Sequence, residues 1–477
     1  MDFRGESVAS LAADVRAGRR SARDLVATAI DRIEEGNADV NAFVAVDYEA
    51  ALEEARGIDD RVAAGEDPGP LAGIPIGVKD LEDAVGFVTT HGSAAHVGDA
   101  PATVDSLLVE RLRDAGCVVV GKTNTPEFGW KAETVNPVFG ATRNPLDLAR
   151  SAGGSSGGSA AAIVAGMVPL ATGSDGGGSI RIPSAVCGLS GMKPSLGRVP
   201  NGGAQAGGWP DLSTRGPMAR RIRDVAVALD AVIGPDPTDI RALPMPEASW
   251  SLSLDDPHPP RRVGWSPTLG FAKVDAEVLA VCEQAVRTLE SLGTEIVEVD
   301  PVFSSDPVRE WLTLAMTYNL RSLERFGDTP VWDQLDPGLV AAMEWARARV
   351  TAVDLVRAGD RCLELNLELV RVLHRGSLLL TPTCAGQTPF VDEPGMVNGE
   401  PELNWVQFTY PLNLTRSPAG TVCAGHTADG MPVGLQVIGP QHGDVAVLRL
   451  LALLEDALSE PQASGAGRPG DEDARRR

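Results

Sequence analysis

Lysine is scarce in this chain of 477 residues. Only five of its 42 basic residues are lysines, and arginine fills the other basic positions. A guanidinium group effectively cannot lose its proton, whereas the amine of lysine can. The few lysines are therefore candidates for positions where the chemistry requires an uncharged amine; they are Lys79, Lys122, Lys131, Lys193 and Lys273.

Other absences exclude whole classes of protein. The net charge is -23, whereas binding to nucleic acid requires clustered lysine and arginine. No apolar run approaches the roughly 20 residues of a membrane span, and the first residues lack the basic and apolar regions of a secretory signal. The six cysteines occur singly, without the spacing of a zinc site or a disulfide framework. We therefore expect a cytoplasmic protein that binds neither nucleic acid nor membrane nor metal.

Short apolar segments alternate with helical patterns from residue 73 onward. The pattern predicts strands over 74–78, 118–120, 168–171, 263–265, 378–380 and 433–438, and helices over 106–115, 159–165, 276–292 and 354–373. This alternation is typical of the α/β class. Residues 1–60 are expected to be helical, with a capped helix start at Ser21. We expect one domain over residues 1–460 and a disordered tail over 461–477, which is polar and rich in glycine.

The region from Ser151 to Pro194 holds two serine sites embedded in glycine. GGSSGG (153–158) leads into an alanine-rich helix, and GGGS (176–179) follows the predicted strand 168–171. Glycine lets a backbone approach a reacting carbonyl closely and lets successive N–H groups converge, as in an oxyanion hole. Such runs are often flexible linkers, but both adjoin strongly apolar elements, which places them inside the fold.

Two other interpretations of these glycine-rich runs are weaker. A phosphate-binding loop would require GxxxxGK[ST] or a GxGxxG motif with a suitable acidic residue, and neither is present. Ser155 and Ser156 formally satisfy the GxSxG motif of a Ser-His-Asp esterase. That motif follows an apolar strand, however, whereas residues 144–150 are turn-like. The histidines downstream lie in no recognisable triad context; they are His258, His374, His426 and His442.

Further motifs resemble one known family in the same order along the chain. They are GIPIGVKD (73–80), GKTNTPEFG (121–129), NPVFGATRNP (136–145), the two glycine-serine runs, RGPMARRIRDVA (215–226), LLLTPT (378–383) and DGMPVGLQVIG (429–439). With these motifs the chain resembles the amidase signature family over nearly its whole length. The resemblance implies a single α/β/α domain around a large mixed sheet and a Ser–cis-Ser–Lys catalytic set.

The resemblance also assigns individual residues. Lys79 matches the lysine of the set, Ser155 the serine that follows a cis peptide, and Ser179 the nucleophile. The oxyanion hole falls on Gly176, Gly177, Gly178 and Ser179, with Ser156, Asp175 and Arg181 as supporting residues. Many relatives have Thr or Ile at the position of Gly176, so we expect this glycine to loosen the loop without removing a backbone donor.

The residues themselves support this chemistry. A serine hydroxyl is a poor nucleophile until a base removes its proton, and a lysine can serve as that base if burial lowers its pKa. Lys79 ends an apolar predicted strand that would exclude water from its amine. We expect Ser179 to attack the carbonyl, Ser155 to pass the proton to Lys79, and water to hydrolyse the acyl-enzyme. This cycle requires no metal or organic cofactor.

The substrate is less well defined by the sequence than the reaction. The candidate pocket residues are Phe128, Trp130, Trp209, Trp332 and Trp405. Amides, aryl amides and carbamates (urethanes) are all possible substrates of such an amidase. We expect the protein to be a monomer or a homodimer. The family also includes the glutaminase subunit of a partner-dependent amidotransferase, but residues 311–350 do not resemble the glutamine-binding part expected of it.

Overall fold

The main strands of the protein form two mixed β-sheets. The computed structural model describes residues 3–203, 208–255, 257–376 and 378–459, and the predicted tail (461–477) lies outside them. The five-stranded sheet has the order β1 (Phe43–Val46), β3 (Val118–Thr123), β2 (Pro75–Lys79), β8 (Leu170–Asp175) and β10 (Thr214–Ala219). The six-stranded sheet has the order β12 (Glu295–Glu298), β11 (Arg262–Trp265), β13 (Leu379–Pro382), β17 (Pro432–Ile438), β16 (Ala419–His426) and β9 (Gly191–Lys193). An isolated bridge between Ser190 and Ala219 links the two sheets, so the expected mixed sheet consists of two joined parts.

The centre of the five-stranded sheet is parallel. Strand β2 pairs in parallel with both β3 and β8, and all residues of these three strands are buried. Strands buried on both faces read as continuous apolar runs, which is why the sequence predicted them. Their carboxyl ends lie at one edge of the sheet, where parallel sheets place their ligand sites. Lys79 ends β2 and Asp175 ends β8.

The N-terminal part contains more than helices. Helices α1 (Val8–Arg16), α2 (Ala22–Val40) and α3 (Tyr48–Ala63) are present, and the Ser21 hydroxyl caps α2 by accepting from the N–H of Arg23 at 3.1 Å. Strand β1 lies between α2 and α3 and pairs antiparallel with β3 at the sheet edge. The prediction of a helical part over 1–60 missed this strand, because its apolar run FVAV is only four residues long and lies between two helical patterns.

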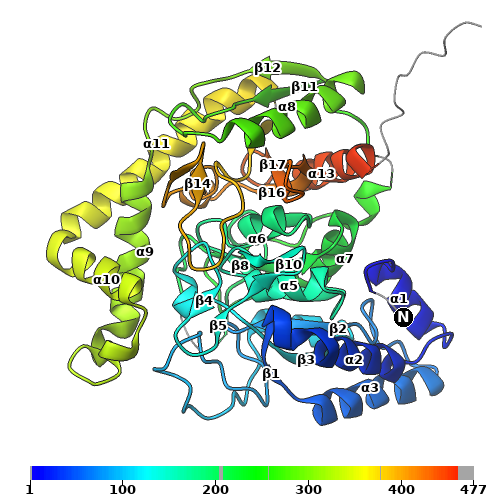
Figure 1. The fold of residues 1–477 in the computed structure, drawn as a ribbon. Coiled ribbons are helices and arrows are strands. Elements are labelled where there is room, and N and C mark those ends of the chain that lie inside the picture. Colours follow the sequence, from blue (N-terminus) through cyan, green and yellow to red (C-terminus); the bar gives the residue numbers. More distant parts are fainter. Residues whose placement is uncertain (1–2, 204–207, 256, 377, 460–477) are drawn as a thin grey trace, which may run out of the picture.

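Helices cover the two sheets and form the α/β/α arrangement that the sequence predicted (Figure 1). The four predicted helices are present with boundaries shifted by a few residues, as α4 (Leu107–Asp114), α5 (Gly157–Val164), α8 (Ala276–Ser291) and α11 (Ala352–Gly376). The others are α6 (Arg181–Val186), α7 (Ile222–Val232), α9 (Val308–Leu323), α10 (Pro337–Arg349), α12 (Pro411–Leu414) and α13 (Asp444–Ser459). Helices α9 and α10 lie at one side of the molecule (Figure 1).

Residues 144–150, which the sequence predicted to be turn-like, belong mostly to a β-hairpin. Strand β6 (Arg143–Asn144) pairs antiparallel with β7 (Asp147–Ser151). Most of β7 is polar and at least partly exposed, which explains why no strand pattern was visible. It therefore differs from the apolar, buried strand that precedes a GxSxG serine.

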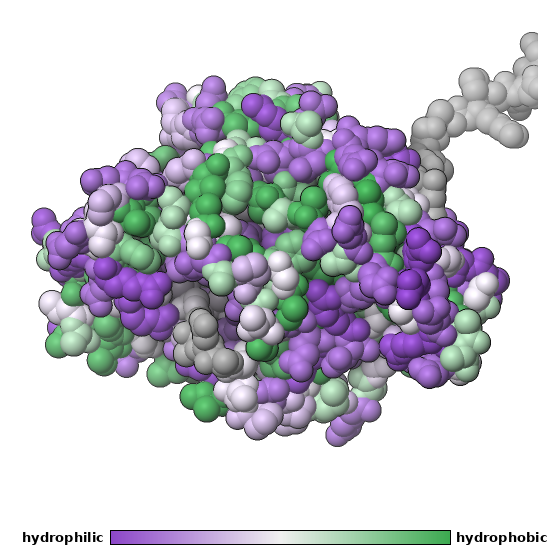
Figure 2. All heavy atoms as spheres, turned by 90° about the horizontal axis from the view of Figure 1, so that it is seen from below, coloured by the Kyte–Doolittle hydropathy of each residue, from purple (hydrophilic) through white to green (hydrophobic). Residues whose placement is uncertain are grey.

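The outer surface mixes polar and apolar groups. Figure 2 shows one face, on which hydrophobic residues gather near the middle and hydrophilic residues lie on either side. Within the described residues, the helices are all too short or too polar to cross a membrane.

Candidate active site

Lys79 lies at the carboxyl end of β2 with its side chain completely buried. Its backbone N–H donates to the hydroxyl of Thr172 on the neighbouring strand β8 at 2.8 Å. Burial lowers the pKa of Lys79 to about 7, although the carboxylates of Glu82 and Asp175 act in the opposite direction. An amine with this pKa is about half uncharged near neutral pH and can accept a proton.

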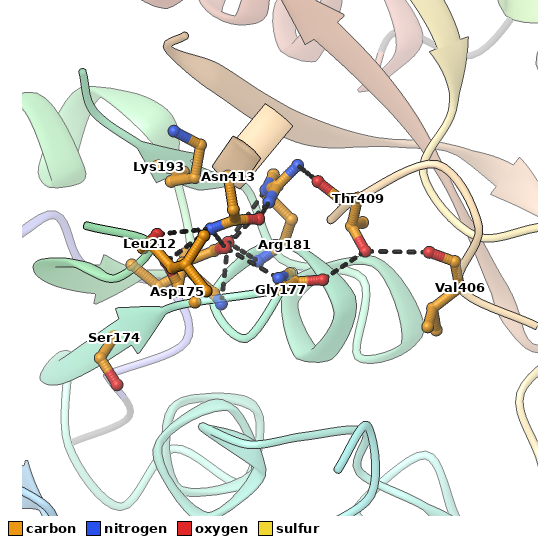
Figure 3. Close-up of polar contacts among 12 residues, drawn as sticks. Ser174, Asp175, Gly177, Arg181, Lys193, Leu212, Val406, Thr409 and Asn413 are labelled. Atoms are coloured by element: carbon orange, nitrogen blue, oxygen red, sulfur yellow. Dashed lines mark hydrogen bonds and ion pairs between the residues drawn. The ribbon is translucent and has the colours of Figure 1, made fainter. Parts of the chain in front are cut away.

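Three serine hydroxyls surround the Lys79 amine. Its Nζ lies 2.7 Å from the Oγ of Ser155, 2.8 Å from that of Ser156 and 3.0 Å from that of Ser174. Ser155 and Ser156 come just before α5, and Ser174 comes from β8. The side chain of Ser174 points away from the Asp175 cluster (Figure 3), as alternation along a strand requires.

The other four lysines, all of which the structure describes, have different surroundings. Lys122 is buried in an ion pair with Asp80 at 2.9 Å. Lys131 pairs with Asp336 at 2.8 Å, and Lys193 donates to the carbonyl of Pro194 at 3.2 Å. Lys273 is exposed. Lys79 is therefore the one lysine whose amine contacts serine hydroxyls.

Ser179 lies close to this group on the loop after β8. Ser179 is partly exposed, whereas Ser155 is buried, and the peptide bond between Gly154 and Ser155 is cis. The backbone N–H of Ser156 donates to the carbonyl of Ser179 at 3.2 Å. The hydroxyls of Ser155 and Ser179, both in described residues, are not hydrogen-bonded to each other in this conformation. The hydrogen-bonded chain thus runs from Lys79 to Ser155 and stops one step before Ser179.

The glycine-rich loop offers backbone donors beside Ser179. Within the described part of the chain, no hydrogen-bond acceptor is bound to the N–H groups of Gly176, Gly177 and Ser179. The N–H of Gly178 differs, because it donates to the carboxylate of Asp175 at 2.8 Å. Of the four predicted oxyanion donors, three therefore have an N–H group without an acceptor among the residues that the structure describes, whereas that of Gly178 is bound to Asp175.

A buried ion pair between Asp175 and Arg181 lies next to this loop (Figure 3). Arg181 and Asp175 are both fully buried, and the carboxylate of Asp175 receives the guanidinium through Nε at 2.9 Å and Nη2 at 2.8 Å. Burial alone would raise the pKa of Asp175, but the charge and hydrogen bonds of Arg181 hold it well below its usual range. The amide of Asn413 donates to Asp175 at 2.9 Å, and Arg181 donates to Gln436 at 2.7 Å. Asp175 and Arg181, which were predicted as supporting residues, thus belong to a buried hydrogen-bond network that also includes Asn413 and Gln436.

Two side chains from distant segments bind the carbonyl groups of the loop. Trp311 Nε1 donates to the carbonyl of Gly176 at 2.8 Å, and Thr409 Oγ1 donates to the carbonyl of Gly177 at 2.6 Å (Figure 3). Gly176 does not loosen the loop, because a Cβ added there would lie 2.6 Å from the ring of Trp209. That ring occupies the space where a side chain at position 176 would otherwise lie.

The predicted pocket aromatics divide into three groups. Trp209 packs against Gly176 in the loop that carries Ser179. Phe128, Trp130 and Trp332 belong to a small apolar cluster between the 127–130 loop, α9 and α10, and Gly129 in that loop would place a Cβ 3.1 Å from the Oγ of Ser155. Trp405 was assigned wrongly to the pocket, because it is only 2% exposed and packs in the core against Gly395.

Comparisons with known proteins identify the family of this chain. The family model described as Amidase matches residues 24–448. The chain belongs to the amidase signature family. An acylamidase of Rhodococcus erythropolis is 38% identical over 460 residues, which are 94% of each chain. One subunit of the glutamyl-tRNA(Gln) amidotransferase of Salinispora arenicola is 37% identical, over 96% of this chain and 98% of its own.

Among solved structures, a bacterial aryl acylamidase has a TM-score of 0.89 and 28% identity to this amidase, over 96% of this chain and 99% of that one. The amidase is an amide-cleaving hydrolase. The Ser-His-Asp esterase alternative is not supported, because the hydroxyls of Ser155 and Ser156 contact Lys79 and not a histidine.

The sequence analysis did not identify several residues that line the site of this amidase. Ser174 was missed because the predicted strand ends at residue 171, whereas β8 continues to Asp175 and brings Ser174 beside Lys79. Thr409 and Asn413 carry no local signal, since they reach the loop from more than 200 residues away. Trp311 lies in a segment whose sequence served only as an argument against the glutaminase alternative.

Proposed function

We propose that Ser179 is the nucleophile of this amidase, with Ser155 as proton relay and Lys79 as general base. The observation that carries this proposal is the 2.7 Å contact between the Lys79 amine and the Ser155 hydroxyl in a fully buried environment. An uncharged amine there can accept a proton that a charged surface lysine would refuse. Ser179 is partly exposed beside them, as a residue that must meet substrate requires.

In the proposed cycle, the Ser179 hydroxyl rotates toward Ser155 and attacks the carbonyl carbon of the amide. As the C–O bond forms, the Ser179 proton passes to Ser155 while the Ser155 proton passes to Lys79. The carbonyl electron pair moves onto oxygen, where the N–H groups of Gly176, Gly177 and Ser179 stabilise the charge.

The tetrahedral intermediate then collapses with cleavage of the C–N bond. The proton on Lys79 returns through Ser155 to the leaving nitrogen, so the amine departs neutral and the acyl group stays on Ser179. Water attacks the acyl carbon and gives its proton to the same relay, and Ser179 recovers a proton as it leaves. Lys79 ends the cycle uncharged, as it began.

The test compares purified Lys79→Ala, Lys79→Arg and Ser179→Ala with wild type on a panel of amides. Each variant is expected to lose at least about a thousandfold in kcat/KM, with an unchanged circular dichroism spectrum. Lys79→Arg is informative because it keeps the charge but cannot act as a base at neutral pH. Lys273→Ala, which changes an exposed lysine, is the control. A folded Lys79→Ala variant with most of its activity would refute the proposal.

We propose a stand-alone hydrolase of small carboxylic amides as the biological activity, because an acylamidase and an aryl acylamidase are similar to the chain over more than nine tenths of its length. Its six cysteines are free, which supports a reducing compartment such as the cytoplasm. Rates on p-nitroanilides, primary amides and aryl carbamates, with Ser179→Ala as blank, measure the preference for amides over carbamates.

A second candidate function rests on the 37% identity to the glutamyl-tRNA(Gln) amidotransferase chain. In that case this chain would release ammonia from glutamine for a partner protein. If it consumes glutamine only when another protein is present, and cleaves none of the simple amides alone, the second function is correct and the stand-alone one is wrong.

A further inference from the structure

Trp311 touches the glycine loop from the first turn of α9. Its indole N–H donates to the carbonyl of Gly176 at 2.8 Å. A Cβ added to Gly177 would lie 2.6 Å from Cζ2 of the same ring, so the indole lies directly against this glycine. Trp311, Gly177 and Ser179 are all partly exposed. Solvent, and hence a substrate, can therefore reach part of each of these residues.

The hydrogen bond from Trp311 acts on one peptide group. The carbonyl of Gly176 and the N–H of Gly177 belong to the same planar unit and point in opposite directions. Holding this carbonyl therefore fixes the direction of the Gly177 N–H, which is a free donor of the proposed oxyanion hole. The next carbonyl is held separately, by Thr409 at 2.6 Å.

Two other aromatic rings hold the indole in place. Trp209 meets it edge-on with ring centres 5.8 Å apart, and Tyr410 lies tilted at 5.9 Å. Both neighbours are anchored, because Trp209 Nε1 donates to Asn319 at 2.9 Å and the Tyr410 hydroxyl donates to Asp306 at 2.5 Å. The indole is thus a rigid flat surface beside Gly177, two residues before Ser179 in the same loop, and rigid aromatic surfaces bind planar apolar groups at little entropic cost.

We propose that Trp311 has two roles in the proposed amidase reaction. It is a positioning residue that orients the Gly177 N–H toward the oxyanion, and it selects amides that carry an aromatic ring directly on the acyl carbon or on the nitrogen. This inference rests on the proposed function, since it assigns the substrate class of the same site. A saturated ring of equal size lacks the flat face that stacks on indole, so it is a poorer substrate.

The experiment separates the two roles with two substitutions. Trp311→Phe keeps an aromatic face and loses the N–H, whereas Trp311→Leu loses both. The substrates are two matched pairs: benzamide with cyclohexanecarboxamide, and acetanilide with N-cyclohexylacetamide. The pair that responds shows whether the ring lies on the acyl or the amine side. Trp345, a half-buried indole of the same apolar cluster on α10, is changed to Phe and Leu as the control.

For Trp311→Phe we expect kcat to fall about tenfold on every substrate, the effect of one lost hydrogen bond, with the aromatic preference retained. For Trp311→Leu we expect a similar fall in kcat and, in addition, a loss of about three- to tenfold in the aromatic-to-saturated ratio of kcat/KM. A substitution that merely loosened the fold would lower both members of a pair equally and leave that ratio unchanged. The Trp345 variants should alter neither quantity.

Opposite results overturn the inference. An unchanged kcat in Trp311→Phe refutes the positioning role. An unchanged aromatic-to-saturated ratio of kcat/KM in a folded Trp311→Leu refutes the selection of aromatic groups. In both cases the proposed function still holds if the wild-type protein cleaves amides. If Trp311→Leu does not fold, an aromatic preference that disappears in Trp311→Phe still refutes selection by the ring face. Wild-type protein that cleaves no amide of the panel refutes the proposed function and this inference together.

Discussion

The sharpest prediction concerns the pH dependence of amide cleavage. Burial lowers the pKa of Lys79 from 10.5 to about 7. At pH 7 this raises the uncharged fraction of the amine from about one in 3000 to about one half. Because only the uncharged amine accepts a proton, kcat/KM is expected to fall about tenfold per pH unit below 7 and to level off above it.

The assay is kcat/KM for one amide between pH 5.5 and 9.5, with protein integrity checked by circular dichroism at each pH. Lys193 requires a control, because burial also lowers its pKa to about 7. The Lys193→Met variant should keep the limb near pH 7, since this lysine does not contact the serines. A profile that is flat through pH 7, or a limb that vanishes only in Lys193→Met, would refute Lys79 as the base.

Three further predictions concern the loop that holds Ser179 and the surroundings of Ser155. Asp175→Asn leaves the buried guanidinium of Arg181 without its counter-charge, so the free energy of unfolding in urea should fall by about 3–5 kcal/mol; a change below about 1 kcal/mol would contradict the role of this pair. Thr409→Val removes the 2.6 Å bond to the Gly177 carbonyl, and kcat should fall about three- to tenfold with little change in KM; an unaltered kcat would show that the carbonyl needs no anchor. Gly129 has φ +71 and would place a Cβ 3.1 Å from the hydroxyl of Ser155, the proposed relay, so Gly129→Ala should lower kcat by about tenfold or more; wild-type turnover would rule out the tight approach.

The residues of the proposed catalytic group carry local signals in the sequence, and the resemblance to the amidase signature family assigned their roles. Lys79 ends a continuous apolar strand, and Ser155 and Ser179 each lie in a glycine run beside an apolar element. These signals need only neighbouring residues. The central parallel strands were predictable for the same reason, because burial on both faces leaves an unbroken apolar run. Strand β1 was missed although it is apolar, because its run of four residues is short and lies between two helices.

The rest depends on contacts that no local pattern encodes. Asn413 reaches Asp175 across 238 residues of sequence, and Trp311 reaches Gly176 across 135. An indole on an amphipathic helix normally packs in a core, so nothing in the sequence marks Trp311 as a donor to the loop. Trp405 shows the converse, because a tryptophan close to glycines in sequence was expected in the pocket and lies in the core instead.

Gly176 shows why local reasoning failed at the loop itself. Glycine increases the freedom of a loop only where the surrounding space is open. Here the ring of Trp209 fills the space where a Cβ would lie, and Asn319 on α9 holds that ring through its indole N–H at 2.9 Å. The stiffness that a Thr or Ile side chain would supply locally comes instead from a helix more than 100 residues away. The rigidity of the proposed oxyanion donors therefore depends on how α9 packs against the loop. If α9 is displaced, we expect this rigidity to be lost before the sheets unfold.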